Sequence, residues 1–231
     1  MSHILDTWVG DFNFTPGRHV FKFSSKKMGA MVKSISPNEH NFCYFLEFDD
    51  RVSSYISQPK PIIYDLYQEG HSYRADFMAE LILDKLTAYE VKPKGYTASQ
   101  CEINKFREIK QCFYHYNINF VIVTGDYIER GKTLKNMKFL KSLIGKTIPA
   151  EIYETLKTLT NTKKIQIEKI KMQLSKKHKI TYQESLKHIY TAIVNRIIFT
   201  DISDEMIGNS SFIGKYHEEK HDRYWNAIPC K

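Results

Sequence analysis

The N-terminal part of the chain alternates short apolar segments with polar turns, and this pattern predicts two strands followed by a helix. Residues 19–23 and 30–35 alternate partly and flank the turn Ser24-Ser25-Lys26-Lys27, as a strand pair would. Ser36-Pro37-Asn38-Glu39 then predicts a helix start, because a capping serine, an early proline and an acid all suit a first helical turn. At helical spacing this helix directs inward Phe42, Phe45 and Leu46.

The pattern continues with strands and helices of similar length up to about residue 141. A polar helix precedes a short, strongly apolar segment, which is typical of a buried strand. A turn is predicted at residues 68–70. The predicted elements in order are strands at 62–64, 73–83, 87–91 and 118–123 and helices at 99–116 and 134–143. Residues 1–141 therefore form, as we expect, an α/β (α+β) domain with a mixed sheet and flanking helices.

Past about residue 142 helical spacing dominates, so we expect a second, helical domain over residues 142–231. A strand at 197–199 and a polar, serine-rich turn follow its last helix, and this order resembles the end of a winged helix. The apolar stripe of that last helix consists of Leu186, Ile189, Tyr190, Ile193 and Val194.

The charge of the chain favours a polyanionic partner. The formal net charge is +8 and the pI is about 9.1, and residues 142–231 hold 15 basic and 10 acidic side chains. A solvated helix face is the alternative interpretation of a lysine run, and it stays open here. The residues that we expect to contact DNA phosphates are Lys163, Lys164, Lys169, Lys171, Lys176, Lys177 and Lys179.

The remaining composition indicates a cytoplasmic protein. No apolar segment approaches the roughly 20 residues that a membrane-spanning helix needs, and the N-terminus lacks the basic start and apolar stretch of a secretory signal. The four cysteines form no pair or cluster at the spacing of a zinc site or a disulfide framework. We therefore expect reduced cysteines and no structural zinc.

Two short motifs suggest functions that their surroundings do not support. Residues 217–221 satisfy the HExxH pattern of zinc proteases, but the neighbouring residues are charged and the chain ends ten residues later. The segment from Gly125 to Lys132 resembles a phosphate-binding loop, but it has five residues between its glycines where that loop has four. A solvated tail and a strand-to-helix turn are the simpler interpretations.

A third motif lies in a more informative place. The pattern of an acid two residues before a lysine occurs three times, and only Glu90-Val91-Lys92 lies on a predicted apolar strand. Residues 90 and 92 share one face of that strand, and a turn near Leu83 would bring Asp76 opposite Glu90. Two carboxylates and one ammonium group would then meet on one side of a sheet.

Such a trio suits the chemistry of a hard divalent cation. Mg²⁺ is commonly held by one or two carboxylates, and a nearby lysine can neutralise charge that develops on a phosphate. Without a cation, two facing carboxylates repel each other and one of them takes up a proton. An exposed cross-strand salt bridge is the alternative interpretation of the hairpin taken alone.

The flanking segments favour the cation site, because seven short pieces occur in an order that resembles the TnsA nuclease family. They span residues 18–141, and they are Ser36-Pro37-Asn38-Glu39, Leu46-Glu47-Phe48-Asp49, Gln58-Pro59, Tyr73-Arg74-Ala75-Asp76-Phe77, Tyr89-Glu90-Val91-Lys92-Pro93, residues 119–124 and residues 134–140. Ala75 departs from the proline that is usual before the aspartate, and some relatives carry glutamine at the position of Glu90.

The resemblance implies a PD-(D/E)xK nuclease with a restriction-endonuclease-like fold and a winged-helix-like C-terminal domain. By the same resemblance Glu39, Asp76, Glu90 and the Val91 carbonyl hold one or two Mg²⁺ ions, which Mn²⁺ can replace, and Lys92 completes the catalytic site. Members of this family cut the 5′ ends of a bacterial transposon. They act with a DDE-type transposase, which cuts the 3′ ends, and with an AAA+ ATPase regulator.

Two other functions remain open from the sequence. The chain could be a stand-alone restriction or repair endonuclease with the same catalytic site, and a neighbouring transposase gene would argue against this. It could also be a non-catalytic DNA-binding adaptor, in which Glu39, Asp76, Glu90 and Lys92 are structural. Metal titration separates the adaptor from both nucleases.

Overall fold

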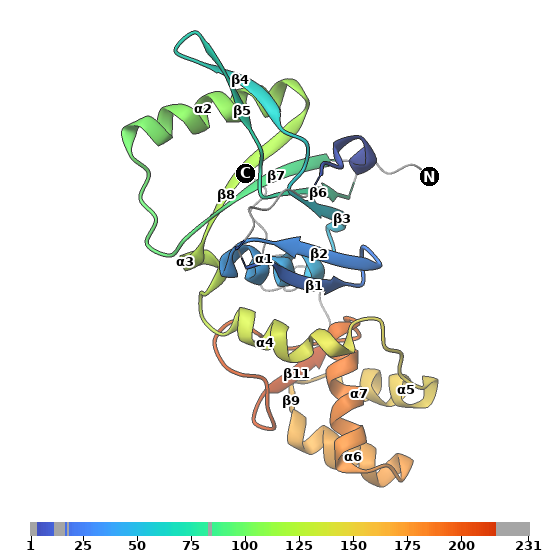
Figure 1. Ribbon diagram of the computed structural model, residues 1–231. Coiled ribbons are helices and arrows are strands. Elements are labelled where there is room, and N and C mark those ends of the chain that lie inside the picture. The colour runs from blue at the N-terminus through green and yellow to red at the C-terminus, as the bar shows by residue number, and fades with distance from the viewer. Residues whose placement is uncertain (1–3, 12–16, 18, 83–84, 216–231) are drawn as a thin grey trace. The chain divides into compact units, whose positions relative to one another are not determined.

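The computed structural model describes residues 4–11, 17, 19–82 and 85–215, and the chain divides into two compact units between Glu129 and Arg130. Figure 1 shows helices and strands in both units, and each unit has its own buried hydrophobic residues. Both units combine helices with strands, so the α+β class predicted from the sequence is confirmed.

The first unit begins with a 3₁₀ turn (η1, Ile4–Trp8), a strand pair and a helix. β1 (Phe21–Ser25) pairs antiparallel with β2 (Ala30–Ser34). α1 (Pro37–Phe48) follows Ser36, whose side chain accepts a hydrogen bond from the Glu39 N–H at 3.1 Å. The second strand and the helix lie where the sequence predicts them, because the apolar spacing and the capping serine act locally. β1 lies two residues later than predicted, since Ser24 and Ser25 pair with β2 and do not form the turn.

A buried carboxylate fastens the β1–β2 turn to the C-terminal half of α1. Glu47 is only 4% exposed, and it accepts hydrogen bonds from Ser25 Oγ at 2.7 Å, the Lys26 N–H at 2.6 Å and Tyr55 Oη at 2.9 Å. Its charge is therefore surrounded by donors, as burial of a carboxylate requires. Burial, together with the charge of Glu47, raises the pKa of Tyr55 far above its usual range, so this hydroxyl stays a donor.

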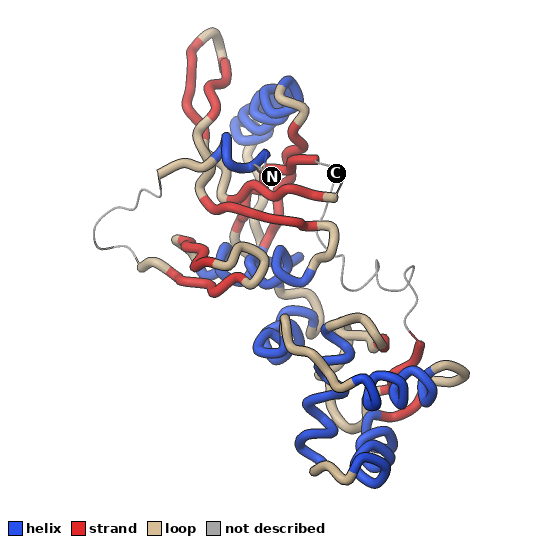
Figure 2. Tube along the Cα trace, turned by 90° about the vertical axis from the view of Figure 1, so that its right-hand side faces the viewer, coloured by secondary structure: helices blue, strands red, loops and turns tan. Residues whose placement is uncertain are grey.

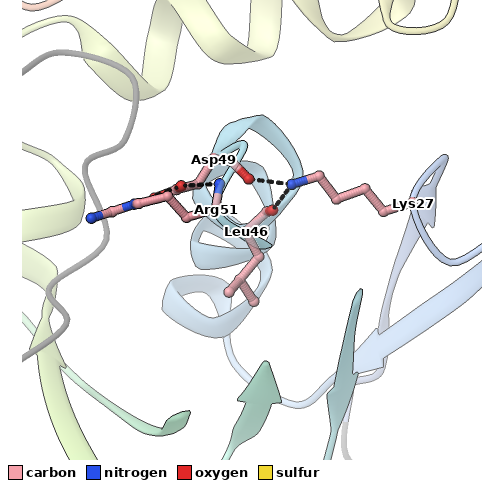
Figure 3. A network of polar contacts seen from close by, with 4 residues as sticks. All are labelled: Lys27, Leu46, Asp49 and Arg51. Carbon is pink, nitrogen blue, oxygen red and sulfur yellow. Dashed lines mark hydrogen bonds and ion pairs between the residues drawn. The ribbon is translucent and has the colours of Figure 1, made fainter. Parts of the chain in front are cut away.

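The last turn of α1 is held by charged side chains. Lys27 Nζ donates to the Leu46 carbonyl at 2.9 Å and also to the Asp49 carbonyl (Figure 3). On the other side Arg51 forms an ion pair of 2.6 Å with the Asp49 carboxylate. Carbonyls at the end of a helix have no partner within it, so the lysine satisfies a group that the helix leaves free.

A four-stranded mixed sheet forms the centre of the first unit. β3 (Val52–Ser57), β6 (Phe77–Leu81), β7 (Lys85–Lys92) and β8 (Ile118–Thr124) follow one another in that order across the sheet. The first three strands are antiparallel, and β7 and β8 are parallel and joined through α2 (Gln100–His115). A short helix, α3 (Gly125–Ile128), follows β8.

Alternation along β7 places the two long helices on opposite faces of this sheet. Tyr89 contacts Phe42 of α1, with ring centroids 5.2 Å apart. Leu86 and Ala88 instead belong to the core cluster that includes Phe106 of α2. The ribbon in Figure 1 shows α1 and α2 on either side of the sheet, and the tube in Figure 2 likewise has helices on both sides of the strands. Glu90 and Lys92 therefore share the α2 side with residues 86 and 88.

A separate hairpin precedes β6 and corrects one prediction. β4 (Ile62–Leu66) pairs with β5 (Glu69–Tyr73), and the turn lies at Tyr67 and Gln68, both at positive φ. The single strand predicted over residues 73–83 is wrong. Tyr73 ends β5 opposite Ile62, and the chain then leaves this hairpin and enters the central sheet at Phe77.

The second unit, as described up to residue 215, has four α-helices and a small three-stranded sheet. The helices are α4 (Thr133–Leu140), α5 (Ala150–Thr160), α6 (Ile167–His178) and α7 (Tyr182–Val194), with a 3₁₀ turn η2 (Lys141–Leu143) after α4. The strands β9 (Ile165–Gln166), β10 (Ile198–Phe199) and β11 (Phe212–Lys215) pair in the order β10-β11-β9. The strand predicted at 197–199 is thus present.

The division of the chain falls earlier than the boundary predicted at 141/142, because α4 packs into the second unit. Asn136 of α4 is fully buried. Its amide group donates to the Ile202 carbonyl at 2.9 Å and the Glu205 carbonyl at 2.7 Å, and its oxygen accepts from the Ile207 N–H at 2.9 Å. A satisfied buried amide ties α4 to the loop before β11, a contact that helical spacing alone does not reveal.

The longest helix described, α2, has 16 residues and a mostly polar sequence. Among the described residues no helix has both the length and the apolar character needed to cross a membrane.

Candidate functional site

Asp76 lies directly before β6 and contacts the neighbouring strand β7. The Asp76 N–H donates to the Tyr89 carbonyl at 3.0 Å, and the Val91 N–H donates to Asp76 Oδ2 at 2.7 Å. Phe77 pairs with Tyr89, so Asp76 lies beside Glu90 one step further along the ladder. The structure therefore brings together Asp76, Glu90 and the Val91 backbone, as the predicted hairpin register requires.

Glu90 is held between a tyrosine and a lysine. Tyr73 Oη donates to Glu90 Oε2 at 2.5 Å, and Lys92 Nζ lies 2.6 Å from Glu90 Oε1. Side chains two residues apart on a strand point to the same face, which explains the contact of Glu90 with Lys92. Both oxygens of this carboxylate thus have donors within the protein.

The helix start places Glu39 near the same group. Glu39 is 4% exposed, and its Oε2 accepts from the Ile35 N–H at 3.0 Å. The neighbouring Asn38 side chain donates to the Lys92 carbonyl at 3.4 Å, so the start of α1 abuts the end of β7. Glu39 therefore accepts a hydrogen bond from the turn before the helix and also lies close enough to the sheet to interact electrostatically with Asp76.

The electrostatics of the group are those of crowded carboxylates. Burial raises the pKa of Asp76 to about 8, and the charges of Glu90 and Glu39 act in the same direction. Burial likewise raises the pKa of Glu39. For Lys92 burial alone would lower the pKa, but the hydrogen bond and the charge of Glu90 outweigh it and keep the pKa above its usual value. Lys92 thus offers one ammonium group to Glu90 and Asp76, and Glu39 lies close enough to Asp76 to add its charge.

This donor set fits a hard divalent cation in its chemistry. Burial and the charge of Glu90 raise the pKa of both Asp76 and Glu39, so this group of carboxyls lacks positive charge. Oxygen donors are the ligands that Mg²⁺ and Mn²⁺ prefer. Across residues 4–215, as far as they are described, no three His, Cys, Asp or Glu side chains already form a metal-binding cluster. Glu39 and Glu90 instead point at the protein donors named above.

Sequence reasoning gave no role to three residues that surround this group. Tyr73 is buried and bonds Glu90 directly. Phe106 of α2 lies between two cations, with Lys92 Nζ 5.2 Å and Lys105 Nζ 5.9 Å from its ring centroid. Lys105 Nζ also lies 5.8 Å from the Tyr73 ring. These residues come from β5 and α2, and only the hairpin and the crossover bring them to β7.

The predicted DNA-binding lysines lie before α6, along it and at its end. Lys163, Lys164, Lys169, Lys176 and Lys179 are exposed, and Lys179 ends the helix at a left-handed φ of 55°. Lys177 is exposed and donates to Thr155 Oγ1 at 3.0 Å. Lys171 differs, because it is 8% exposed and pairs with Glu168 at 2.6 Å. It faces the interior and is poorly placed to contact a phosphate.

The two glycines of the loop-like motif serve packing. A side chain at Gly125 would meet the Lys94 N atom at 2.6 Å, and one at Gly131 would strike the Ser203 carbonyl. The Lys132 N–H donates to that same carbonyl at 2.5 Å. This N–H is therefore directed at the chain itself and not at a phosphate. The HExxH match at residues 217–221 lies outside the described residues.

Together these contacts make a cluster of acids beside one lysine, at the end of a sheet strand and next to a helix start. Such a cluster can bind a cation and present an ammonium group to an anion. In comparisons with known proteins, no family model and no curated protein matches this chain.

Proposed function

We propose that this chain is the Mg²⁺-dependent endonuclease subunit of a heteromeric bacterial transposase, and that it cuts the 5′ ends of the transposon. The observation that carries the proposal is the meeting of Asp76 with Glu90 and the Val91 backbone, with Lys92 on the same face as Glu90. A mixed sheet between two helices supports a restriction-endonuclease-like fold for the first unit. The TnsA-like order of segments points to the same nuclease.

Each acidic residue has a role in this proposal. Asp76 and Glu90, with Glu39 and the Val91 carbonyl as further oxygen donors, would hold one or two Mg²⁺ ions, or Mn²⁺ in their place. A bound ion would supply Lewis-acid stabilisation of phosphate charge and lower the pKa of a water. Burial disfavours the charged form of Asp76, so a cation is the partner that makes this carboxylate stable at neutral pH.

Lys92 and Tyr73 both contact Glu90, and Lys92 would also interact with the DNA. Lys92 keeps its proton at neutral pH, since Glu90 holds its pKa above the usual value. A protonated lysine can neutralise charge that develops on the scissile phosphate. Tyr73 Oη donates to Glu90 Oε2, the oxygen that Lys92 does not contact, and so orients this carboxylate. Tyr73 is a positioning residue, because it acts through Glu90.

The second unit supports a role in docking on DNA. Its order of α5, β9, α6, α7, β10 and β11 supports a winged-helix-like domain, in which α6 and α7 would be the helix-turn-helix pair. In such pairs the first helix crosses the DNA backbone, and α6 is the helix that carries exposed Lys169, Lys176 and Lys177. Contacts of this kind would give affinity without sequence preference.

The partners follow from the family resemblance. A DDE-type transposase would cut the 3′ ends, an AAA+ ATPase would regulate the complex, and duplex DNA carrying the transposon ends would be the substrate. The complex would act in the bacterial cytoplasm.

A cleavage assay tests this function. Purified protein is incubated with Mg²⁺ and duplex DNA that carries the transposon ends, with and without the candidate transposase. We expect 5′-strand cuts at the ends, and we expect Asp76→Ala and Glu90→Ala to abolish them while the circular dichroism spectrum is kept. Cutting at the wild-type rate by either variant would refute the site. Cuts at sites unrelated to transposon ends would favour a stand-alone nuclease.

A further inference from the structure

The edge of the central sheet formed by β8 lacks the protection that edge strands usually have. In the order β3-β6-β7-β8 the strand β8 is last, and among the described residues no strand pairs with its outer side. β8 has seven residues, Ile-Asn-Phe-Val-Ile-Val-Thr, with no charge, proline or glycine. Edge strands are normally short, charged, bulged or covered, because free N–H and C=O groups invite pairing. An uncharged edge strand of this length is therefore well suited to pair with another strand.

A groove runs between this edge and α2. It encloses about 490 Å³, and β8 contributes Phe120, Val121 and Ile122 to its lining. From α2 come Ile103, which is 43% exposed, and the exposed cations Arg107 and Lys110. Neither cation forms an ion pair with a described residue. The groove therefore combines an apolar floor with uncompensated positive charge.

The spacing along α2 gives this surface a direction. Ile103, Arg107, Lys110 and Tyr114 recur at intervals of three and four residues, so they form one stripe along the helix. Tyr114 is 78% exposed at the far end of the stripe. If another strand paired with β8, every second side chain of that strand would point to the face of the sheet that α2 covers. Those side chains would lie next to the stripe.

We propose that β8 and the α2 stripe form a docking site for an extended segment of a partner protein that alternates apolar and acidic residues. The segment would pair with the β8 backbone, which is a general mode of peptide recognition. Its apolar side chains would fill the groove beside Ile103 and Phe120, and its carboxylates would meet Arg107 and Lys110. A second copy of the chain fits less well, since it would bring another uncharged β8 and no carboxylate from that strand.

The test uses the full chain and a synthetic peptide. The probe is a fluorescein-labelled peptide of alternating valine and glutamate, about seven residues long, and binding is followed by fluorescence anisotropy. The variant Arg107→Glu/Lys110→Glu reverses the groove charges. The matched control is Lys22→Glu/Lys33→Glu, which changes the net charge equally at an exposed pair on β1 and β2. A peptide of alternating valine and lysine and a valine–glutamate peptide with a central proline complete the set.

We expect the valine–glutamate peptide to bind the wild type and to bind the groove variant at least roughly tenfold more weakly. The groove variant should instead gain affinity for the valine–lysine peptide, and the control variant should behave as wild type. The proline peptide should fail, because proline cannot donate to the ladder and disrupts pairing.

Three results would overturn the proposal. The first is absence of wild-type binding at about 1 mM peptide. The second is that the control variant weakens peptide binding as much as the groove variant does, or that the proline peptide binds as well as the valine–glutamate peptide. Either result would mean that net charge, and not strand pairing in the groove, governs binding. The third is a dimer in sedimentation that the peptide dissociates, because the edge would then belong to a second copy of the chain.

Discussion

Asp76 is the residue at which stability and the proposed function oppose each other. Its carboxylate is partly buried beside Glu90 and Glu39, and Lys92 interacts with Asp76 and Glu90. A carboxyl group whose pKa is raised in the folded protein prefers its proton there, whereas the unfolded chain ionises it readily. Stability from this group is therefore present at low pH and is lost as the pH rises between about 4 and about 8.

The substitution Asp76→Asn should accordingly stabilise the protein in the absence of divalent cations. Asparagine keeps an oxygen that can accept the Val91 N–H, and it removes the buried charge. We expect a gain of about 1–2 kcal/mol in the free energy of unfolding at pH 7 in EDTA, and no gain near pH 4. Urea denaturation at both pH values measures it. A loss of stability at pH 7 would show that Asp76 is already compensated.

Lys92 should separate binding of the cation from cutting of DNA. In Lys92→Gln the carboxylates remain, so Mn²⁺ binding should persist, but the charge offered to the scissile phosphate is lost. We expect cutting to fall at least roughly a hundredfold. Cleavage assays and Mn²⁺ titration of the same sample measure the two effects. If cutting and Mn²⁺ binding fell together, Lys92 would instead be holding the acids in place.

Some of the contacts of this group can be predicted from the sequence and others cannot. The alternation around Asp76, Glu90 and Lys92 is local to one hairpin, so the sequence predicts that the three meet. Tyr73 and Lys105 reach the group from β5 and α2, and no local pattern relates those elements to β7. Their roles follow only from the fold.

At the scale of elements, Glu47 connects three segments that are separate along the chain. It links the β1–β2 turn, α1 and β3 through Ser25, Lys26 and Tyr55. Since Glu39 lies in the first turn of α1, this connection also stabilises one side of the candidate site.

Replacement of Glu47 by alanine should leave several buried donors without an acceptor. We expect a loss of roughly 3 kcal/mol in the unfolding free energy of the first unit, since each unsatisfied buried group costs about 1–3 kcal/mol. Glu69→Ala is the control, because Glu69 is exposed on β5. Urea unfolding followed by circular dichroism compares the two variants. Equal, small losses would mean that Glu47 contributes little to the fold.

Elements with strong local signals are predicted well, and elements that depend on pairing are not. Capping serines mark the starts of α1 and α2, and apolar runs mark β7 and β8. β3 is not predicted, because Ser53 and Ser54 interrupt its apolar alternation and a register shift follows Val52. Such a strand is defined by its partner β6 and not by its own sequence.

At the scale of the whole molecule, the division into two units separates the acid cluster from the lysine-rich helix. Sequence spacing puts the division at residues 141/142, whereas the compact units divide between Glu129 and Arg130, since the buried contacts of Asn136 involve residues distant in sequence. The structure also sorts the lysines of the run, because Lys171 is buried and paired while the others are exposed.

The exposed lysines should set how DNA affinity depends on salt. Lysines that neutralise phosphates release counterions, so each lost contact lowers the slope of log K against log salt by about 0.9 for duplex DNA. We expect Lys169→Gln/Lys176→Gln/Lys177→Gln to weaken binding to all duplexes alike and to flatten this slope. Lys171→Gln, the control, should lower stability and leave the slope unchanged. An unchanged slope in the triple variant would indicate a protein-binding or merely solvated face.

Binding of Mn²⁺ shows directly whether Asp76 and Glu90 form a metal site. The electron paramagnetic resonance signal of free Mn²⁺ is followed as the wild type, Asp76→Asn, Glu90→Gln and Asp65→Asn are titrated at pH 7.5. Asp65 is an exposed acid on β4 and serves as the control. We predict that the wild type and Asp65→Asn bind Mn²⁺ equally and that both cluster variants lose this binding. Mn²⁺ binding of wild-type strength by Asp76→Asn would contradict the account.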